Sequence, residues 1–304
     1  MNTELPCPNC HVLLLSPWTH VPGIPVAAGQ VDCNAGWSGA GAVFPGDIQM
    51  NLGTCGNFGI VHDKPVFQDT MIAFPYTTDS ENTFITVPTT TTGGQLIRYL
   101  RDNLWQAERD AAAAGSGVDP YDLINQEAEN VSPGSEGLVI LPYLMGERTP
   151  LWDVDARGVF FGLSLNHGRG HIARAAMESV AYALYDSWTI LSSSGLEINK
   201  PIILNEGGAK SDLWREIITD VFGVQTAMVE SRAGAPYGDA ILAGVATGIF
   251  PDYSVARKNA RYVNYREPNM DNHALYQEYF KIYKSLYFHV REDYRALAAL
   301  RNRV

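Results

Sequence analysis

The chain has 304 residues, of which 46% are hydrophobic, and its mean hydropathy is −0.10. A chain of this length and composition can bury one large core or two medium ones. The formal net charge is −11, from 22 basic and 33 acidic residues. This balance excludes a basic face suited to nucleic acid or an anionic membrane, so we expect any nucleotide to be held by backbone amides or a metal.

Targeting signals and metal-binding motifs are weak. No run of 18 apolar residues occurs, and no basic segment precedes the short apolar run near residue 13, so we expect neither a spanning helix nor a secretory signal and place the chain in the cytoplasm. Cys7 and Cys10 form a C-x-x-C pair without a second ligand pair, so no metal ligand is assigned. Cys33 and Cys55 are expected to be reduced thiols.

The N-terminal part begins with an irregular leader, residues 1–24, and continues with a stretch that suggests chemistry. The apolar run Pro25–Gly29 leads to Asp32, and a second run, 48–52, ends in the loop Gly53–Gly56. Glycine-rich turns after strands let backbone N–H groups converge on an anion. A carboxylate near such a loop suits phosphoryl transfer. The alternative, a β-hairpin with ordinary turns, stays open at this point.

Further elements alternate between strands and helices, which indicates an α/β layer structure. Ile97, Leu100 and Leu104 repeat at helical spacing and predict one helix over 95–114. The aromatic residues of the last expected helix should lie in a core or an interdomain seam. In chain order, the expected elements are strand 84–87, helix 95–114, helix 120–129, strands 137–142 and 158–163, helix 171–191, strand 201–205, a helix from 211, strand 225–229, and helices 238–248 and 272–300.

Glycine-rich turns precede three of the expected helices, at Gly93–Gly94, Gly207–Gly208 and Gly234. Helix N-termini with such entrances suit nucleotide phosphates. None of the three fits the P-loop pattern or the Rossmann fingerprint, so both of those nucleotide-binding classes are disfavoured.

Between residues 142 and 178 the chain resembles the FGGY family of carbohydrate kinases. The similarity rests on LMGERTP at 144–150, ARGVFFGL at 156–163 and HIARAAME at 171–178. Two further segments agree in the same order: 205–214 resembles the family's adenosine-binding turn and 234–243 its closing helix motif. The resemblance covers about residues 25–265, and the wording is closest to xylulokinase-type members.

This resemblance implies an actin-like ATPase (ribonuclease H-like) fold, with a mixed sheet flanked by helices. It implies ATP and Mg²⁺ as cofactors and a small sugar, a ketopentose such as D-xylulose, as acceptor. Asp32 would be the general base. The phosphate-binding residues would be Gly53, Thr54, Gly56, Gly94 and Arg98, and the adenine-binding residues Gly207, Gly208, Ala209 and Asp212.

The resemblance also implies an incomplete protein. Family members have two domains with the sugar between them, and this chain has no Asp-x-Gly-Thr loop ahead of residue 25 to help hold Mg²⁺. We therefore expect residues 25–62 to be the end of the family's N-terminal domain and 63–304 its C-terminal nucleotide-binding domain, active only with a missing N-terminal half. The alternatives are a non-catalytic nucleotide- or partner-binding module, which could form a homodimer, and a kinase for another polyol or sugar acid.

Overall fold

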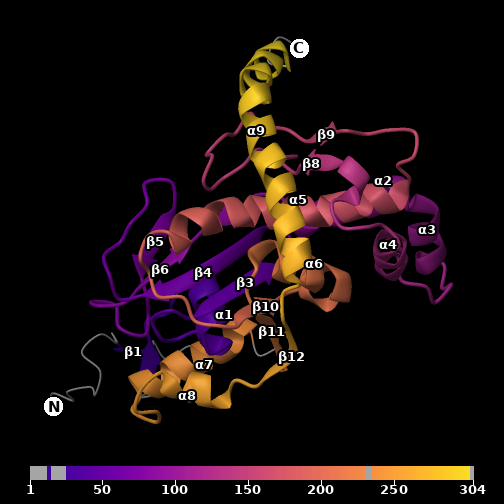
Figure 1. The fold of residues 1–304 in the computed structure, drawn as a ribbon. Coiled ribbons are helices and arrows are strands. Elements are labelled where there is room, and N and C mark those ends of the chain that lie inside the picture. The colour runs from indigo at the N-terminus through magenta and orange to yellow at the C-terminus, as the bar shows by residue number, and fades with distance from the viewer. Residues whose placement is uncertain (1–11, 15–24, 231–233, 302–304) are drawn as a thin grey trace.

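The computed structural model describes residues 12–14, 25–230 and 234–301. An eight-stranded sheet forms its centre, in the order β12-β11-β10-β3-β4-β6-β5, with β7 also paired to β4 (Figure 1). β10 runs parallel to β3 and β11, and the other pairs are antiparallel, so the sheet is mixed. Its strands are β3 (Ile48–Leu52), β4 (Gly56–His62), β5 (Ile72–Pro75), β6 (Phe84–Val87), β7 (Thr89–Thr90), β10 (Ile202–Asn205), β11 (Thr226–Val229) and β12 (Tyr262–Arg266).

Two small antiparallel ribbons lie outside this sheet: β1 (Val12–Leu14) with β2 (Pro25–Ala27), and β8 (Val139–Leu141) with β9 (Val159–Phe161). The helices are α1 (Asp32–Gly39), α2 (Gly94–Leu104), α3 (Gln106–Ala113), α4 (Pro120–Glu129), α5 (Arg169–Ser192), α6 (Asp212–Phe222), α7 (Gly234–Ala246), α8 (Ser254–Asn259) and α9 (Met270–Arg301), with 3₁₀ turns η1 (Ser135–Gly137) and η2 (Gly208–Lys210). In the described part of the chain, no helix has the length and apolar character needed to cross a membrane.

Helices cover both faces of the sheet. Successive strand residues point to opposite faces, and β4 shows this with Ile60 and Val61. Ile60 belongs to the large core beneath α5, α6 and α9, whereas Val61 packs in a separate cluster with Trp37 of α1. Figure 1 shows the same division, with α5 and α9 on one side of the strands and α1, α7 and α8 on the other.

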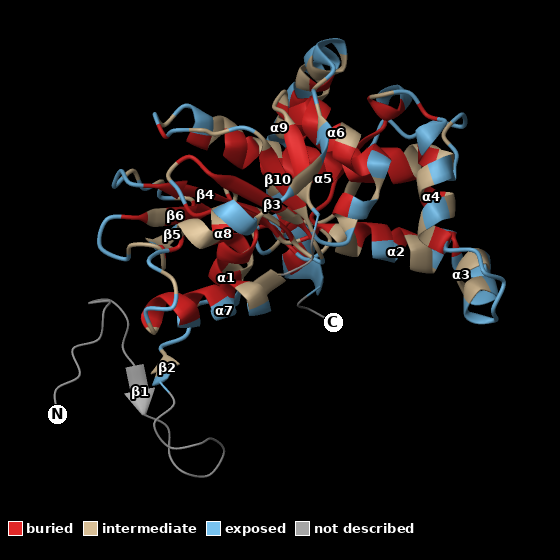
Figure 2. Ribbon diagram, turned by 90° about the horizontal axis from the view of Figure 1, so that it is seen from below, coloured by how far each residue is buried: buried red, intermediate tan, exposed pale blue. Residues whose placement is uncertain are grey.

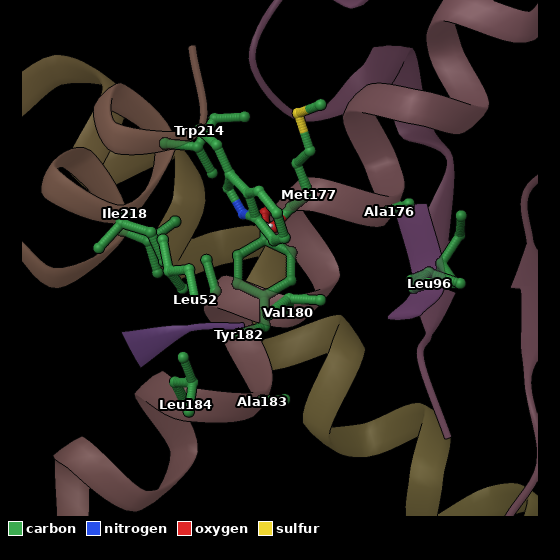
Figure 3. Packing of buried hydrophobic residues seen from close by; sticks show 14 of the residues in the cluster. Leu52, Leu96, Ala176, Met177, Val180, Tyr182, Ala183, Leu184, Trp214 and Ile218 are labelled. Atoms are coloured by element: carbon green, nitrogen blue, oxygen red, sulfur yellow. Dashed lines mark hydrogen bonds between the residues drawn. The ribbon is translucent and has the colours of Figure 1, made fainter. Parts of the chain in front are cut away.

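Helix α5 is the centre of the core. Every residue from Ala173 to Leu184 is buried, which is the pattern of a helix enclosed on all sides. Figure 2 shows the buried residues concentrated on α5 and the central strands, while α3 is largely exposed or half-buried. In Figure 3, Met177 and Tyr182 of α5 lie against Leu52 of β3 and Trp214 of α6. This packing brings the end of β3 close to the start of α6.

The expectation that the aromatic face of the last helix is core is confirmed. Five of its residues are buried: Tyr276, Phe280, Tyr283, Leu286 and Tyr287. Tyr279 is half-buried. The Tyr283 hydroxyl lies 2.5 Å from that of Tyr143, so the helix is fastened to the segment that follows β8.

Two expectations about elements are corrected. The stretch 25–59 is not one hairpin, because α1 separates the two apolar runs and Ile48–Leu52 pairs with Gly56–His62. The expected helix 95–114 divides at Trp105, a fully buried residue with φ −118° and ψ 37° whose indole N–H donates to Glu127.

The leader, residues 1–24, lies outside the described residues except for β1. Cys7 and Cys10 therefore also lie outside them. Cys33 and Cys55 are free thiols, as expected.

Candidate nucleotide site

A cleft of ≈ 430 Å³ opens where β3 and β10 end. The two strands are parallel neighbours, so their carboxyl ends meet at one edge of the sheet, which is where open α/β sheets bind ligands. The loop after β3, the start of α2, helix α4, Met177 of α5 and the turn after β10 contribute the walls. The lining residues are Leu52, Gly53, Thr54, Gly94, Ile97, Arg98, Asp119, Tyr121, Asp122, Ile124, Asn125, Met177, Glu206, Gly207, Gly208, Lys210, Ser211 and Trp214.

Backbone hydrogen bonds from the start of α2 hold the loop between β3 and β4. The N–H of Gly94 donates to the carbonyl of Gly53 at 2.6 Å, and the N–H groups of Gly93 and Gln95 donate to Thr54 O at 3.0 and 3.1 Å. A Cβ on Gly94 would lie 2.7 Å from Gly53 O, so no larger residue fits there. The first N–H groups of α2 are therefore used to fix the loop and are not available to a ligand.

Open backbone donors come instead from two turns. In the described part of the chain, the N–H groups of Gly53, Thr54 and Cys55 make no hydrogen bond, and those of Gly207 and Gly208 make none either. Successive unpaired N–H groups in a turn form a concave site for an anion. The two turns meet across the cleft and can bind a chain of phosphates.

Beside the Gly207–Gly208 turn, the wall of the cleft contains Trp214 and suits an aromatic base. Trp214 is buried, and its indole N–H donates to Met177 O at 3.2 Å, which fixes the ring in the wall. The Ser211 hydroxyl caps α6 by accepting from Trp214 N at 3.1 Å, and it donates to Asn125 Oδ1 at 2.6 Å. A Cβ on Gly208 would lie 2.7 Å from Leu52 Cβ, so glycine alone permits this close packing.

Charges of both signs line the cleft. The side chains of Arg98 and Lys210 make neither a hydrogen bond nor an ion pair within the described residues, so both cations are available to a phosphate. Asp119 caps α4, because its Oδ1 accepts from Tyr121 N at 2.8 Å. Glu206 lies at the opposite wall, in the turn after β10.

A buried carboxylate, that of Glu147, holds the segment that precedes α2. Glu147 accepts hydrogen bonds from the Thr90 hydroxyl at 2.6 Å and from Thr91 N at 2.8 Å. Two residues on, the Thr149 hydroxyl accepts from Thr89 N at 2.7 Å. These contacts fasten the segment that leads into Gly93 and Gly94. Burial raises the pKa of Glu147 to about 7.

The structure brings six of the predicted ligand-binding residues into this cleft: Gly53, Thr54, Gly94, Arg98, Gly207 and Gly208. Three others lie outside it. Gly56 packs in the core, where a Cβ would lie 2.9 Å from Thr90 Cγ2, and Ala209 is fully buried. Asp212 pairs with Arg215 and its side chain is 73% exposed, so it acts as a first-turn acid of α6 and does not face a base in the cleft.

Asp32 is also not a lining residue of the cleft. It is the first residue of α1, is exposed, and its Oδ1 accepts from Cys33 N at 2.7 Å. Helix α1 packs tightly on α7, with Gly39 against Gly234 and Gly238 against Ala35. The carboxylate thus has a fixed place at a helix start and is open to solvent.

Sequence reasoning missed several lining residues. Lys210, Ser211 and Trp214 lay inside the recognised turn segment but were not assigned individually. Tyr121 and Asn125 come from α4, and no local pattern marks a helix that is brought to the site only by tertiary packing.

Mg²⁺ has no preformed cage in the described residues, because no group of three or more His, Cys, Asp or Glu side chains comes together there. Mg²⁺ is usually bound through one or two carboxylates plus substrate phosphates, so the cleft, with its open amides and single carboxylates, fits a metal that arrives with the nucleotide.

A model of the FGGY family of carbohydrate kinases, C-terminal domain, matches residues 49–247. The chain belongs to this family. The family match begins at residue 49, within β3.

Relatives and solved structures agree with this assignment. The chain is 31% identical to the gluconokinase of Bacillus licheniformis over 91% of this chain and 54% of that protein, and 30% identical to the xylulose kinase of Staphylococcus epidermidis over 87% and 51%. The ligand-bound xylulose kinase from Lactobacillus acidophilus superposes with a TM-score of 0.78 at 26% identity, covering 91% of this chain and 54% of that one. The predicted actin-like ATPase fold is confirmed. The chain spans about half the length of these relatives.

Proposed function

We propose that this chain is the nucleotide-binding part of an ATP-dependent carbohydrate kinase. The observation that carries the proposal is the cleft at the ends of β3 and β10, where two glycine-containing turns with open N–H groups face each other beside the unpaired cations Arg98 and Lys210. A phosphoryl-transfer site needs chiefly positioning and charge stabilisation, and these groups supply both.

In this proposal the base of ATP packs against Trp214, and the phosphates run along the Gly53–Cys55 loop. Arg98 and Lys210 offset the phosphate charge. Mg²⁺ bound with the nucleotide would neutralise charge that develops on the transferred group. Asp32 accepts the proton of the attacking hydroxyl, and its exposed position at the start of α1 leaves it open to an acceptor outside the cleft.

The acceptor we propose is a small sugar or sugar acid. The amino-acid sequences of the motifs favour a ketopentose such as D-xylulose, and relatives named xylulose kinase support this acceptor. Relatives named gluconokinase, at 31% and 35% identity, support D-gluconate equally well. Both compounds are therefore candidate acceptors for the same chemistry.

A second candidate is a module that binds nucleotide without catalysis. Two observations favour it: the chain spans about half of its relatives, and Asp32 does not line the cleft. In this case ATP binds in the cleft, but no hydroxyl is phosphorylated by the chain alone.

The test is an assay of ADP release by the chain with D-xylulose, D-gluconate and a panel of polyols. The proposal predicts acceptor-dependent release that Asp32→Asn abolishes without changing ATP affinity. Asp63→Asn, at another exposed carboxylate, is the control and should keep full activity. Turnover that survives Asp32→Asn would remove Asp32 as base. ATP binding without turnover on any acceptor would support the binding module.

A further inference from the structure

Glu206 has an unusual backbone conformation for its residue type. Its φ is +73°, in the left-handed region that favours glycine, although the next two residues are themselves glycines. Asn205 Oδ1 accepts from Glu206 N at 2.9 Å and helps to hold this conformation. A non-glycine residue in this region is strained, and such strain is often retained at functional sites.

The side chain of Glu206 extends toward the phosphate end of the cleft. Its Cγ and Cβ lie 3.7 and 3.9 Å from where a Cβ on Gly53 would stand, so it lies over the loop after β3. In the described part of the chain its carboxylate accepts no hydrogen bond and forms no ion pair, so no protein group uses it.

A lone carboxylate beside a phosphate chain opposes binding unless a cation lies between them. Like charges a few ångströms apart repel each other even at the surface of a protein. A divalent ion reverses the sign of this interaction, and Mg²⁺ prefers one or two carboxylates together with phosphate oxygens and water. Of the other two acids in the cleft, Asp119 is the cap of α4 and Asp122 lies in the first turn of the same helix.

We propose that Glu206 holds the Mg²⁺ of bound MgATP, directly or through one of its waters, and thereby makes the cleft selective for the metal complex over free ATP. This inference rests on the proposed nucleotide site. A metal-binding role would explain the left-handed backbone of Glu206, because this conformation places the side chain over Gly53.

The test is calorimetric titration of the chain with ATP in excess EDTA and with ATP in excess Mg²⁺. The wild-type chain should bind MgATP about tenfold more tightly than free ATP, a ratio that corresponds to one screened charge contact. Glu206→Gln should bring the ratio close to one, chiefly by strengthening the binding of free ATP. Asp63→Asn, at an exposed carboxylate that does not line the cleft, is the control and should keep the wild-type ratio. Bound Mn²⁺–ATP, observed by electron paramagnetic resonance, should show an altered spectrum only in Glu206→Gln.

Three outcomes overturn the inference in distinguishable ways. An unchanged ratio in Glu206→Gln removes Glu206 from the metal. An equal loss of affinity with and without Mg²⁺, together with weaker binding of adenosine, assigns Glu206 to the ribose instead. A wild-type chain that binds neither form of ATP overturns the proposed nucleotide site itself, and the assignment of Glu206 with it.

Discussion

Gly94 and Gly53 are joined by a hydrogen bond of 2.6 Å from amide to carbonyl, between the first residue of α2 and the loop after β3. The β3–β4 loop, whose amides are open to phosphate, is thus held by the first residues of α2, whose amides are already used. The glycine turns recognised in the sequence therefore have two different tasks: Gly53 and Gly207 present open amides, whereas Gly93 and Gly94 permit close backbone contact.

Gly94→Ala should weaken ATP binding by about tenfold and lower the free energy of unfolding by ~1–3 kcal/mol, because the new Cβ would overlap Gly53 O and displace the loop. Calorimetry and urea denaturation measure the two effects. Gly36→Ala in α1 is the control, since nothing lies within 4 Å of its Cβ position. It should stabilise the fold by ~0.5–1 kcal/mol as a helix-interior glycine replacement. Equal behaviour of the two variants would contradict the assigned role of Gly94.

Glu147 should make stability fall as the pH rises. Its pKa is raised from the ordinary 4.5 to about 7, because burial outweighs the hydrogen bonds from Thr90, Thr91 and Arg148 N. The folded state therefore holds the proton more tightly than the unfolded state. The associated stability is fully present below pH 4.5 and is lost between pH 4.5 and about 7, and it amounts to roughly 3 kcal/mol.

Urea denaturation at several pH values across this window checks the effect, with Glu147→Gln as comparison. The variant cannot ionise at this position, so the difference in unfolding free energy between the two proteins should shrink or change sign as the pH rises. A difference that stays constant with pH would show that Glu147 does not titrate in this range.

Glu206→Gly should raise the free energy of unfolding by ~1 kcal/mol, because glycine adopts φ +73° without strain. The same variant should lose the preference for MgATP. Thermal denaturation measures the first effect and nucleotide titration the second. A destabilised Glu206→Gly would mean that the carboxylate supports the fold and not a ligand.

A buried charged network joins α5 to η1 and α9. Glu178 accepts from Gly134 N and the Ser135 hydroxyl, both at 2.9 Å, from Arg174 Nε at 3.0 Å and from the Tyr276 hydroxyl at 3.2 Å. Glu178→Ala leaves the Arg174 guanidinium buried without its partner.

The expected cost of Glu178→Ala is ~3–5 kcal/mol in the free energy of unfolding. Glu278→Ala is the control. It breaks the exposed pair with Lys281, and the expected change is within about 0.5 kcal/mol. Denaturant melts of both variants measure the contrast, and a cost below 1 kcal/mol for Glu178→Ala would contradict the role of this network.

Much of the fold could be predicted because the local signals agree with the tertiary environment. The strands 84–87 and 201–205, the cap at Ser211 and the aromatic face of α9 were all predicted from spacing and residue type, and the structure confirms them. Helix α1 was missed because its glycines disfavour a helix on their own. They are accepted there because Gly39 allows α1 to approach α7 closely, and no local pattern reports such a contact.

The residues of the candidate site could be predicted only in part. Residues in glycine-rich turns, such as Gly53 and Gly208, were found because their conformational freedom has a reason in the sequence. Asp212 does not line the cleft, because an acid in the first turn of a helix can face solvent as readily as a ligand, and here it pairs with Arg215. Asn125 could not be found, because its place in the cleft depends on how α4 packs, whereas Glu206 lay inside the recognised turn segment but was not assigned individually.

The proposed function depends on the binding of ATP in the cleft between the β3–β4 loop and the Gly207–Gly208 turn. The most direct measurement is titration of the 304-residue chain with ATP in the presence of Mg²⁺, followed by calorimetry and by the fluorescence of Trp214, which lines the cleft. We predict saturable binding of one ATP per wild-type chain. Gly208→Leu should lose this binding, because a side chain at this position would overlap Leu52 and Trp214. No saturable binding by the folded wild-type chain, or unchanged binding by a folded Gly208→Leu variant, would contradict it.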